Sequence, residues 1–288
     1  MAESSAAHRP ASVKPCTFDY VRAETAVEAI GVLADVGEDA RVLAGGQSLM
    51  AMLNMRLVQP RVLVDISRTA ELDYAYARDG KLVIGAASTQ ATIERRPTLE
   101  AEVPLLRQAF PHISHVQIRS RGTVCGSVAH ADPGAELPLI LLALDGEVVL
   151  RSKRGRRVLP AEKFLQGMLS TARRSDELVE EVRYPIRRDG CGYAFAEFST
   201  RRGDFAIVAA AAVVSEEGKG PLAALVGLNE RTVRTSVFRL AQEGWLASQQ
   251  LGRRSFYRLT EDGRRRIDAV GERLYGRAPR AWDQRQPL

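Results

Sequence analysis

The chain contains little cysteine and no long hydrophobic run. Its three cysteines, Cys16, Cys125 and Cys191, are scattered, which argues against a disulfide framework, a thiolate zinc site and an iron–sulfur cluster of its own. The longest apolar run, residues 206–214, is far too short to cross a bilayer, and the polar N-terminus lacks the apolar centre of a secretory signal. These absences predict a reduced, cytoplasmic protein.

The standard phosphate-binding signatures are also missing. The sequence has neither the Gly-Lys-Ser/Thr of a P-loop nor the G-x-G-x-x-G of a dinucleotide fold. His112 and His115 have a spacing that suits a metal on a helix, but no third ligand is evident, so we expect a packing or solvent-facing role and no metal site. A bound nucleotide would have to be held in some other way.

Positive charge is concentrated at one end of the chain. Of the 288 residues, 45% are hydrophobic and 26% charged, as in an ordinary globular protein. From residue 216 onward there are 14 Lys and Arg against 9 Asp and Glu, whereas residues 1–215 carry 27 against 26. This asymmetry predicts two parts with different partners. A smaller basic run, residues 151–158, is interpreted as a solvated hairpin turn.

Hydrophobic periodicity and turn residues predict a core that mixes helices and strands. Thr25 is expected to cap a helix that Gly37 ends, with Val27, Ile30 and Leu33 at helical spacing. We also expect strands over 41–46, 61–67 and 81–89 (the last after an Asp79-Gly80 turn), two strands within 194–214, helices over 48–57 and 104–110, and a hairpin over 146–164. Residues 215–221 form the best linker, being polar, glycine-bearing and closed by proline.

Two loops nearly bare of side chains are the strongest functional signal. Gly45 and Gly46 interrupt an apolar segment between a predicted strand and a predicted helix, where glycine lets a ligand approach the main-chain N–H groups. About 75 residues later, Gly122 and Gly126 flank small and hydroxyl-bearing residues, with carboxylates following. Two such loops would suit an extended nucleotide with a diphosphate in the middle.

The motifs resemble those of a known family. "AGGQSL", "TVCGSVAHADPGAELP" and "FSTRRGDFAIVAAAAVV" occur in this order, and together they resemble the flavoprotein (medium) subunit of the molybdenum hydroxylases, the group of carbon monoxide dehydrogenase and xanthine dehydrogenase. The resemblance covers about residues 16–214. It implies an α+β fold, an FAD-binding domain of the vanillyl-alcohol-oxidase (PCMH) type with two subdomains and the flavin between them.

The resemblance also implies which residues hold FAD. Those expected at the pyrophosphate and ribityl chain are Ala44, Gly45, Gly46, Gln47, Ser48, Leu49, Thr123, Val124, Cys125, Gly126 and Ser127, with Asp132 and Glu136 beside the ribityl and isoalloxazine part. The family often has glycine where Cys125 stands. A cation near reduced flavin could come from Arg201 or Arg202, although an exposed arginine pair is more often a solvated turn.

The implied chemistry is that of an electron-transferring oxidoreductase subunit. No catalytic side chain is expected, because FAD carries the redox chemistry. The implied partners are an iron–sulfur small subunit, which delivers electrons, and a molybdopterin-binding large subunit, which holds the substrate. The chain alone is therefore not expected to hydroxylate a substrate.

The basic tail is organised differently. We expect a short helix over 221–228, a second helix capped by Asn229, and a hairpin of 245–250 with 254–260, which together make a winged helix. This part resembles the N-terminal region of the phenylacetate-degradation repressor family over about 220–288, with the first helix of that family missing. The residues expected to face DNA are Arg231, Arg234 and Thr235 on the helix, and Arg253 and Arg254 at the hairpin tip.

The predicted organisation is a polar leader (1–15), an FAD-binding domain (16–214), a linker (215–221) and a truncated winged helix-turn-helix (222–288). Three functions remain open at this point. The leading one is the FAD-bearing subunit of a molybdenum hydroxylase with a foreign tail. The alternatives are a winged-helix transcriptional regulator and a non-functional fusion product, and an accidental fusion is favoured over a flavin-sensing repressor because both halves look incomplete.

Overall fold

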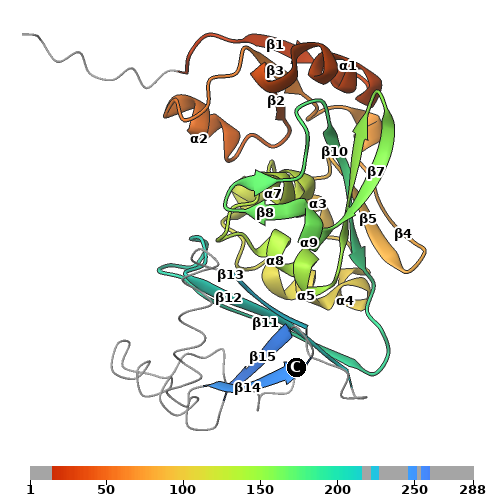
Figure 1. Ribbon diagram of the computed structural model, residues 1–288, viewed down its shortest axis with the longest axis vertical. Coiled ribbons are helices and arrows are strands. Elements are labelled where there is room, and N and C mark those ends of the chain that lie inside the picture. The colour runs from red at the N-terminus through yellow and green to blue at the C-terminus, as the bar shows by residue number, and fades with distance from the viewer. Residues whose placement is uncertain (1–14, 216–221, 227–245, 252–253, 260–288) are drawn as a thin grey trace, which may run out of the picture.

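The computed structural model describes residues 15–215, 222–226, 246–251 and 254–259, with side chains over 15–213. Within these residues the fold is α+β, as predicted, and three larger sheets follow one another along the molecule (Figure 1). No helix in this part of the chain is long and apolar enough to cross a membrane.

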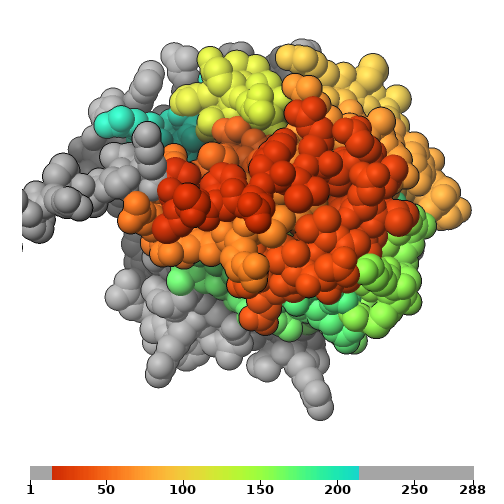
Figure 2. All heavy atoms as spheres, turned by 90° about the horizontal axis from the view of Figure 1, so that it is seen from above, coloured from red at the N-terminus to blue at the C-terminus, as the bar shows by residue number. Residues whose placement is uncertain are grey.

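The first sheet is parallel and has the order β1-β3-β2. Its strands are β1 (Asp19–Arg22), β3 (Val62–Asp65) and β2 (Ala40–Leu43). Helix α1 (Ala26–Val36) connects β1 to β2. Figure 2 shows this N-terminal part spread over one end of the molecule. Helix α2 (Leu49–Asn54) follows β2 and is shorter than predicted.

The predicted ends of α1 are confirmed, but its buried stripe differs. The Thr25 side chain accepts a hydrogen bond from the Glu28 N–H, and Gly37 ends the helix at φ 66°. Ile30 and Leu33 are buried, whereas Val27 is 65% exposed. The small residues Ala26 and Ala29 take the remaining places against the sheet, and spacing alone did not distinguish them from the valine.

The second sheet is antiparallel, with the order β4-β5-β10-β6-β7. Its strands are β4 (Ala75–Arg78), β5 (Lys81–Gly85), β10 (Leu178–Pro185), β6 (Glu147–Ser152) and β7 (Gly155–Pro160). Asp79 and Gly80 form the predicted turn between β4 and β5, both with positive φ, which matches the twist of a tight hairpin.

Short helices lie beside this sheet and form the middle of the molecule (Figure 1). They are α3 (Gln90–Glu94), α4 (Leu99–Glu102), α5 (Pro104–Ala109), α6 (Val116–Arg119), α7 (Val124–His130), α8 (Glu136–Ala143) and α9 (Ala161–Phe164). Helix α5 was predicted from the sequence. One continuous hydrophobic core runs from α1 through the second sheet and these helices to β12.

The third sheet contains a correction to the predicted helix over 221–228. Strands β11 (Cys191–Phe198) and β12 (Val208–Ser215) are present as predicted, and the structure pairs them antiparallel. Residues 222–226, however, form strand β13 (Leu222–Val226), which pairs antiparallel with β12. A short apolar segment has no decisive period of its own, and the open edge of β12 supplies hydrogen-bond partners for a strand. Of the predicted linker, 215–221, Ser215 ends β12 and residues 216–221 lie outside the described residues.

The predicted tail hairpin is present as β14 (Leu246–Leu251) and β15 (Arg254–Leu259), which pair antiparallel. The predicted DNA-reading helix lies outside the described residues, so the winged helix stays a prediction. A last small pair, β8 (Leu165–Gly167) and β9 (Ser170–Thr171), lies next to α7.

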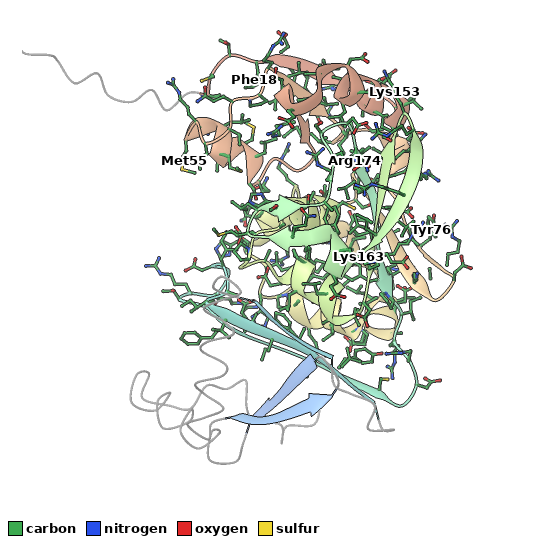
Figure 3. The ribbon with its side chains drawn as sticks, in the orientation of Figure 1. Phe18, Met55, Tyr76, Lys153, Lys163 and Arg174 are labelled. Carbon is green, nitrogen blue, oxygen red and sulfur yellow. The ribbon has the colours of Figure 1, made fainter. Side chains whose placement is uncertain are left out.

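The basic run over 151–158 forms a hairpin with an exposed turn, as predicted, and acids bind several of its side chains. Arg151 and Arg156 both donate to the Glu180 carboxylate, at 2.9 and 2.7 Å, and Arg157 binds Glu177 through two hydrogen bonds. The Lys153 ammonium lies 2.7 Å from a carboxylate oxygen of α1, that of Asp35, and Figure 3 shows Lys153 extended toward that helix. The hairpin therefore attaches β10 and α1 to each other through charge.

We expect Glu180→Ala to lower the free energy of unfolding by about 2 kcal/mol, measured by urea denaturation. Only 3% of the Glu180 side chain is exposed, and its removal leaves Arg151 half-buried without a carboxylate. The loss is placed below that of a fully buried pair because both arginines keep contact with water. Glu100→Ala, on an exposed residue, should change the free energy by less than about 0.5 kcal/mol. Equal losses in the two variants would contradict this assignment.

Candidate functional site

The two glycine loops meet in the structure. A Cβ atom placed on Gly45 would lie 2.6 Å from the Cα atom of Gly122 and 2.8 Å from the carbonyl carbon of Arg121. Such distances are too short for any side chain, so the first loop requires glycine where it crosses the second. The two segments lie 77 positions apart in sequence and are brought together with main chain against main chain.

The first loop presents backbone donors. It leaves β2 after Leu43, and Gly46 adopts φ 73° before α2 begins at Leu49. Among the described residues, no hydrogen-bond acceptor is found for the backbone N–H groups of residues 45–48, while the Gln47 side chain donates to the Gly45 carbonyl at 3.0 Å. Unpartnered N–H groups in one turn attract an anion.

The second loop is held by a threonine cap. Thr123 caps α7, and its hydroxyl accepts a hydrogen bond from the Gly126 N–H at 2.9 Å. The side chains of Val124 and Cys125 point into the core, where the Cys125 thiol contacts the Ile84 carbonyl oxygen at 3.4 Å and burial raises the pKa of this thiol. Neither of these two side chains is therefore available to a ligand.

A third segment, which the sequence analysis missed, joins the junction. Gln90 donates its N–H to the Gly122 carbonyl at 2.8 Å, and Val124 donates to the Ser88 carbonyl at 3.3 Å, so that Thr89 and Thr123 lie side by side. The Gln90 side chain is buried, and its carbonyl oxygen has no hydrogen-bond partner among the described residues. The signal was a run of small residues with a Ser and a Thr directly after a strand, which was interpreted as part of that strand.

The two predicted carboxylates lie in different surroundings. Asp132 is half-buried and accepts the Gly134 N–H at 2.8 Å. Glu136 begins α8 and is only 5% exposed. Burial first, and then the neighbouring carboxyl groups of Glu197 and Asp132, raise the pKa of Glu136 to about 8.

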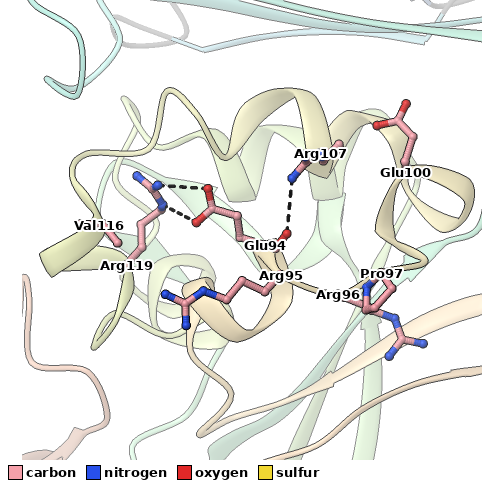
Figure 4. A pocket seen from close by; sticks show the side chains of 8 residues that line it. All are labelled: Glu94, Arg95, Arg96, Pro97, Glu100, Arg107, Val116 and Arg119. Carbon is pink, nitrogen blue, oxygen red and sulfur yellow. Dashed lines mark hydrogen bonds and ion pairs between the residues drawn. The ribbon is translucent and has the colours of Figure 1, made fainter.

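Two cavities lie apart from the glycine loops. The larger, of about 530 Å³, is lined by four arginines, two glutamates, Pro97 and Val116 (Figure 4). Two of these arginines already have carboxylate partners, since Arg119 binds Glu94 and Arg96 binds Glu102. The smaller, of about 390 Å³, includes Ser88 and Thr92. Neither is lined by residues of the two glycine loops, so the predicted site lies elsewhere.

Other predicted residues are placed as follows. Arg201 and Arg202 are exposed in the β11–β12 turn. The described residues contain no group of three or more His, Cys, Asp and Glu that could hold a metal ion. Of the predicted DNA contacts, Arg231, Arg234, Thr235 and Arg253 lie outside the described residues, and Arg254 is described only as backbone in β15.

A nucleotide diphosphate fits this junction. The unpartnered N–H groups at 45–48 suit the negative charge of the diphosphate. Because Gly45 has no side chain, the two loops lie close enough together to contact the same ligand. The orphaned carbonyl oxygen of Gln90 is an acceptor that needs a donor, which a sugar or ribityl hydroxyl can supply. The residues present therefore match the two halves of a dinucleotide such as FAD, charged linker and hydroxyl-bearing chain.

Comparison with protein-family models gives two matches. Residues 16–187 match the FAD binding domain in molybdopterin dehydrogenase, which is more than half of the chain. Residues 220–263 match PaaX-like proteins, and most of that stretch lies outside the described residues.

Individual proteins agree with the first match. The chain is 44% identical to the 6-hydroxypseudooxynicotine dehydrogenase complex subunit alpha of Paenarthrobacter nicotinovorans, covering 72% of this chain and 71% of that protein. It is 35% identical to the carbon monoxide dehydrogenase medium chain of Hydrogenophaga pseudoflava, covering 71% of each. The solved carbon monoxide dehydrogenase of Hydrogenophaga pseudoflava superposes with a TM-score of 0.72 at 30% identity, over 90% of this chain and 86% of the other.

We expect Gly45→Ala to raise the Kd for FAD at least tenfold, measured by quenching of flavin fluorescence. The added methyl must push the first loop away from Gly122 and so separate the donors of the two loops. Gly31→Ala is the matched control, because its Cβ meets no atom within 4 Å in α1. It should leave the Kd unchanged and slightly stabilise the helix. Wild-type affinity in Gly45→Ala would show that the loop contact does not matter for binding.

Proposed function

The chain belongs to the family of FAD-binding domains in molybdopterin dehydrogenases, and from that premise we propose how its residues hold the cofactor and which partners it serves. The chain is an FAD-binding oxidoreductase subunit that transfers electrons. The observation that supports the binding site best is the contact of Gly45 with the backbone at Gly122, because it joins the two loops that the motifs assign to one ligand.

The binding roles divide between main chain and side chain. The N–H groups of residues 45–48 hold the pyrophosphate, and the Thr123 cap keeps the second loop in place against it. In this proposal Gln90 and Asp132 accept hydrogen bonds from hydroxyls of the ribityl chain or ribose, supported by the unpartnered Gln90 oxygen and by Asp132 being an acceptor. Because the donors are fixed before the ligand arrives, little ordering is required on binding.

Bound FAD supplies the redox chemistry, accepting electrons on one side and releasing them on the other. The chain itself contributes orientation and exclusion of water. Its three cysteines are too few for an iron–sulfur cluster, which takes four thiolates. We therefore place the electron donor on another polypeptide.

The partners proposed are an iron–sulfur subunit and a molybdopterin-binding subunit. The support is that similar proteins are named as the subunit alpha of a dehydrogenase complex and as a medium chain, hence as parts of larger assemblies. Substrate oxidation then takes place outside this chain. The regulator alternative receives less support, because the PaaX-like match spans only residues 220–263 against 16–187 for the flavin domain.

We expect the purified full-length chain to bind one FAD per protein molecule. The measurement is the flavin absorbance of protein loaded with FAD and freed of excess by gel filtration, followed by heat release and identification of the nucleotide. FMN at equal concentration should bind far more weakly, because it lacks the second phosphate and the adenosine that the two-loop junction is proposed to hold.

Protein that elutes as a folded species without flavin, after loading, would contradict the proposed function. If FMN and FAD bind with equal affinity, the chain is still a flavin-binding protein, but the pyrophosphate does not have the role proposed for it. The two outcomes are separated by the same titration.

A further inference from the structure

Strand β11 carries an acid on its core-facing side. Along this strand half-buried and exposed residues alternate, and Glu197 falls on the same side as Tyr193 and Phe195, which pack on the core. Only 1% of the Glu197 side chain is exposed. Both of its carboxylate oxygens are buried and have no hydrogen-bond partner among the described residues. An isolated buried carboxylate is strongly unfavourable, so its charge must be balanced or removed.

His112, the basic side chain paired with Glu197 among the described residues, does not balance the charge of Glu197. His112 Nδ1 lies 3.9 Å from a Glu197 oxygen, beyond hydrogen-bond distance. Burial and the nearby Arg202 guanidinium lower the pKa of His112 from 6.5, so the ring is neutral at pH 7. The histidine instead packs edge-on against Phe195, with ring centroids 5.4 Å apart.

The Ser199 hydroxyl also acts on the Glu197 carboxylate, but its proton is donated to the Arg201 carbonyl at 3.0 Å. The remaining group that can satisfy Glu197 is another acid, Glu136 at the start of α8. The two side chains are close enough for each to act on the charge of the other, and both are buried. Two carboxyl groups in such a position hold one proton between them, with the protonated one donating to the other. This arrangement removes one charge from the interior and gives the orphaned oxygens a donor.

We propose that Glu136 and Glu197 share one proton and that the resulting hydrogen bond positions the β11–β12 hairpin against the loop of residues 131–136. Both are positioning residues, and the role in FAD retention rests on the proposed function. The hairpin turn already contacts this loop. Ala206 donates to the Gly134 carbonyl at 3.4 Å, and a Cβ on Gly134 would lie 3.3 Å from that of Phe205.

The pair therefore connects the third sheet to the proposed FAD site. Asp132 and Gly134 precede α8 directly, and the same hairpin turn also rests on the segment after α5, where a Cβ on Gly203 would meet Ser114. Figure 1 shows β11 and β12 running below α8 and α5. If both acids ionise, like charges in a dry contact separate these layers.

Among the side chains that the structure describes, few other charged groups surround the pair. Those in its neighbourhood are Asp132 before α8, His130 at the end of α7, 4.0 Å from Asp132, and His112 and Arg202 as described. Strand β12 carries no titratable residue over 208–213. Arg107 of α5 donates to the Glu94 carbonyl, and Glu162 and Lys163 of α9 are exposed.

The direction of the pH dependence follows from the proton. The pKa of Glu136 is raised from 4.5 to about 8 in the folded chain, chiefly by burial, so the folded state holds the proton more tightly than the unfolded chain. Stability from the pair is fully present below pH 4.5 and is lost as the pH rises through about 8. Affinity for FAD should decline over the upper part of this range.

The test compares wild type with Glu197→Gln between pH 6.5 and 9.5 (a range set around the pKa of about 8). We expect the wild-type Kd for FAD to rise at least fivefold from the lower to the upper limit. In Glu197→Gln only one acid remains at this contact, and the amide N–H can donate to Glu136 once that residue ionises, so the Kd should change less than twofold. Glu100→Gln, on an exposed residue, serves as the control and should follow the wild type.

Two further measurements keep the outcome decisive. The thermal midpoint of the chain without FAD should fall over the same pH range in wild type and stay level in Glu197→Gln, whether or not FAD binds. Infrared spectroscopy at pH 7 should show a protonated carboxyl band in wild type, and Glu197→Gln should shift or remove this band because the hydrogen-bond partner of Glu136 has changed. If wild type binds no flavin but shows both the pH-dependent thermal midpoint and the carboxyl band, the proposed function is overturned and the shared proton of Glu136 and Glu197 is retained. Identical pH profiles and infrared spectra in the two proteins would overturn the shared proton.

Discussion

The close approach of two backbones, at Gly45 and at Gly122, is the constraint on which the site depends. The first loop extends from the parallel sheet, and the second begins helix α7 beside the antiparallel sheet. Neither loop could reach the other past a side chain. Their contact therefore fixes the two layers in one relative position, and it leaves a set of N–H groups free to bind an anion at the junction. The segment 88–90 then adds a third backbone, so the junction is held from three elements rather than two.

Buried acids show a second constraint, which is that each interior charge requires a partner. At β10 two acids bind arginines from the β6–β7 hairpin: Glu180 in the strand and Glu177 directly before it. On β11 no cation among the described side chains binds Glu197, since burial and Arg202 keep His112 neutral. A shared proton with Glu136 is the remaining way to reduce the charge. The same physical demand thus produces a permanent clamp at one side of the molecule and a pH-dependent contact at the other.

Much of the fold was predictable because its signals are local. The cap at Thr25, the stop at Gly37 and the Asp79-Gly80 turn each depend on the conformational preference of one or two residues, and the structure confirms them. The predicted helix over 221–228 was wrong, because a short apolar segment takes the conformation that its neighbour offers, here the edge of β12. Gln90 escaped notice for a related reason: nothing in its own sequence context shows that Gly122 will lie beside it.

The sequence by itself determined the two glycine loops and the family to which they belong. Glycine is read directly from the sequence, and its lack of a side chain has the same consequence for the backbone in any fold. The tertiary structure decided what those loops touch, which side chains point away from them, as Cys125 does, and where a lone acid such as Glu197 must find a proton. The reason is distance. Backbone preference acts within a few residues, whereas desolvation and close packing act between segments that only folding brings together.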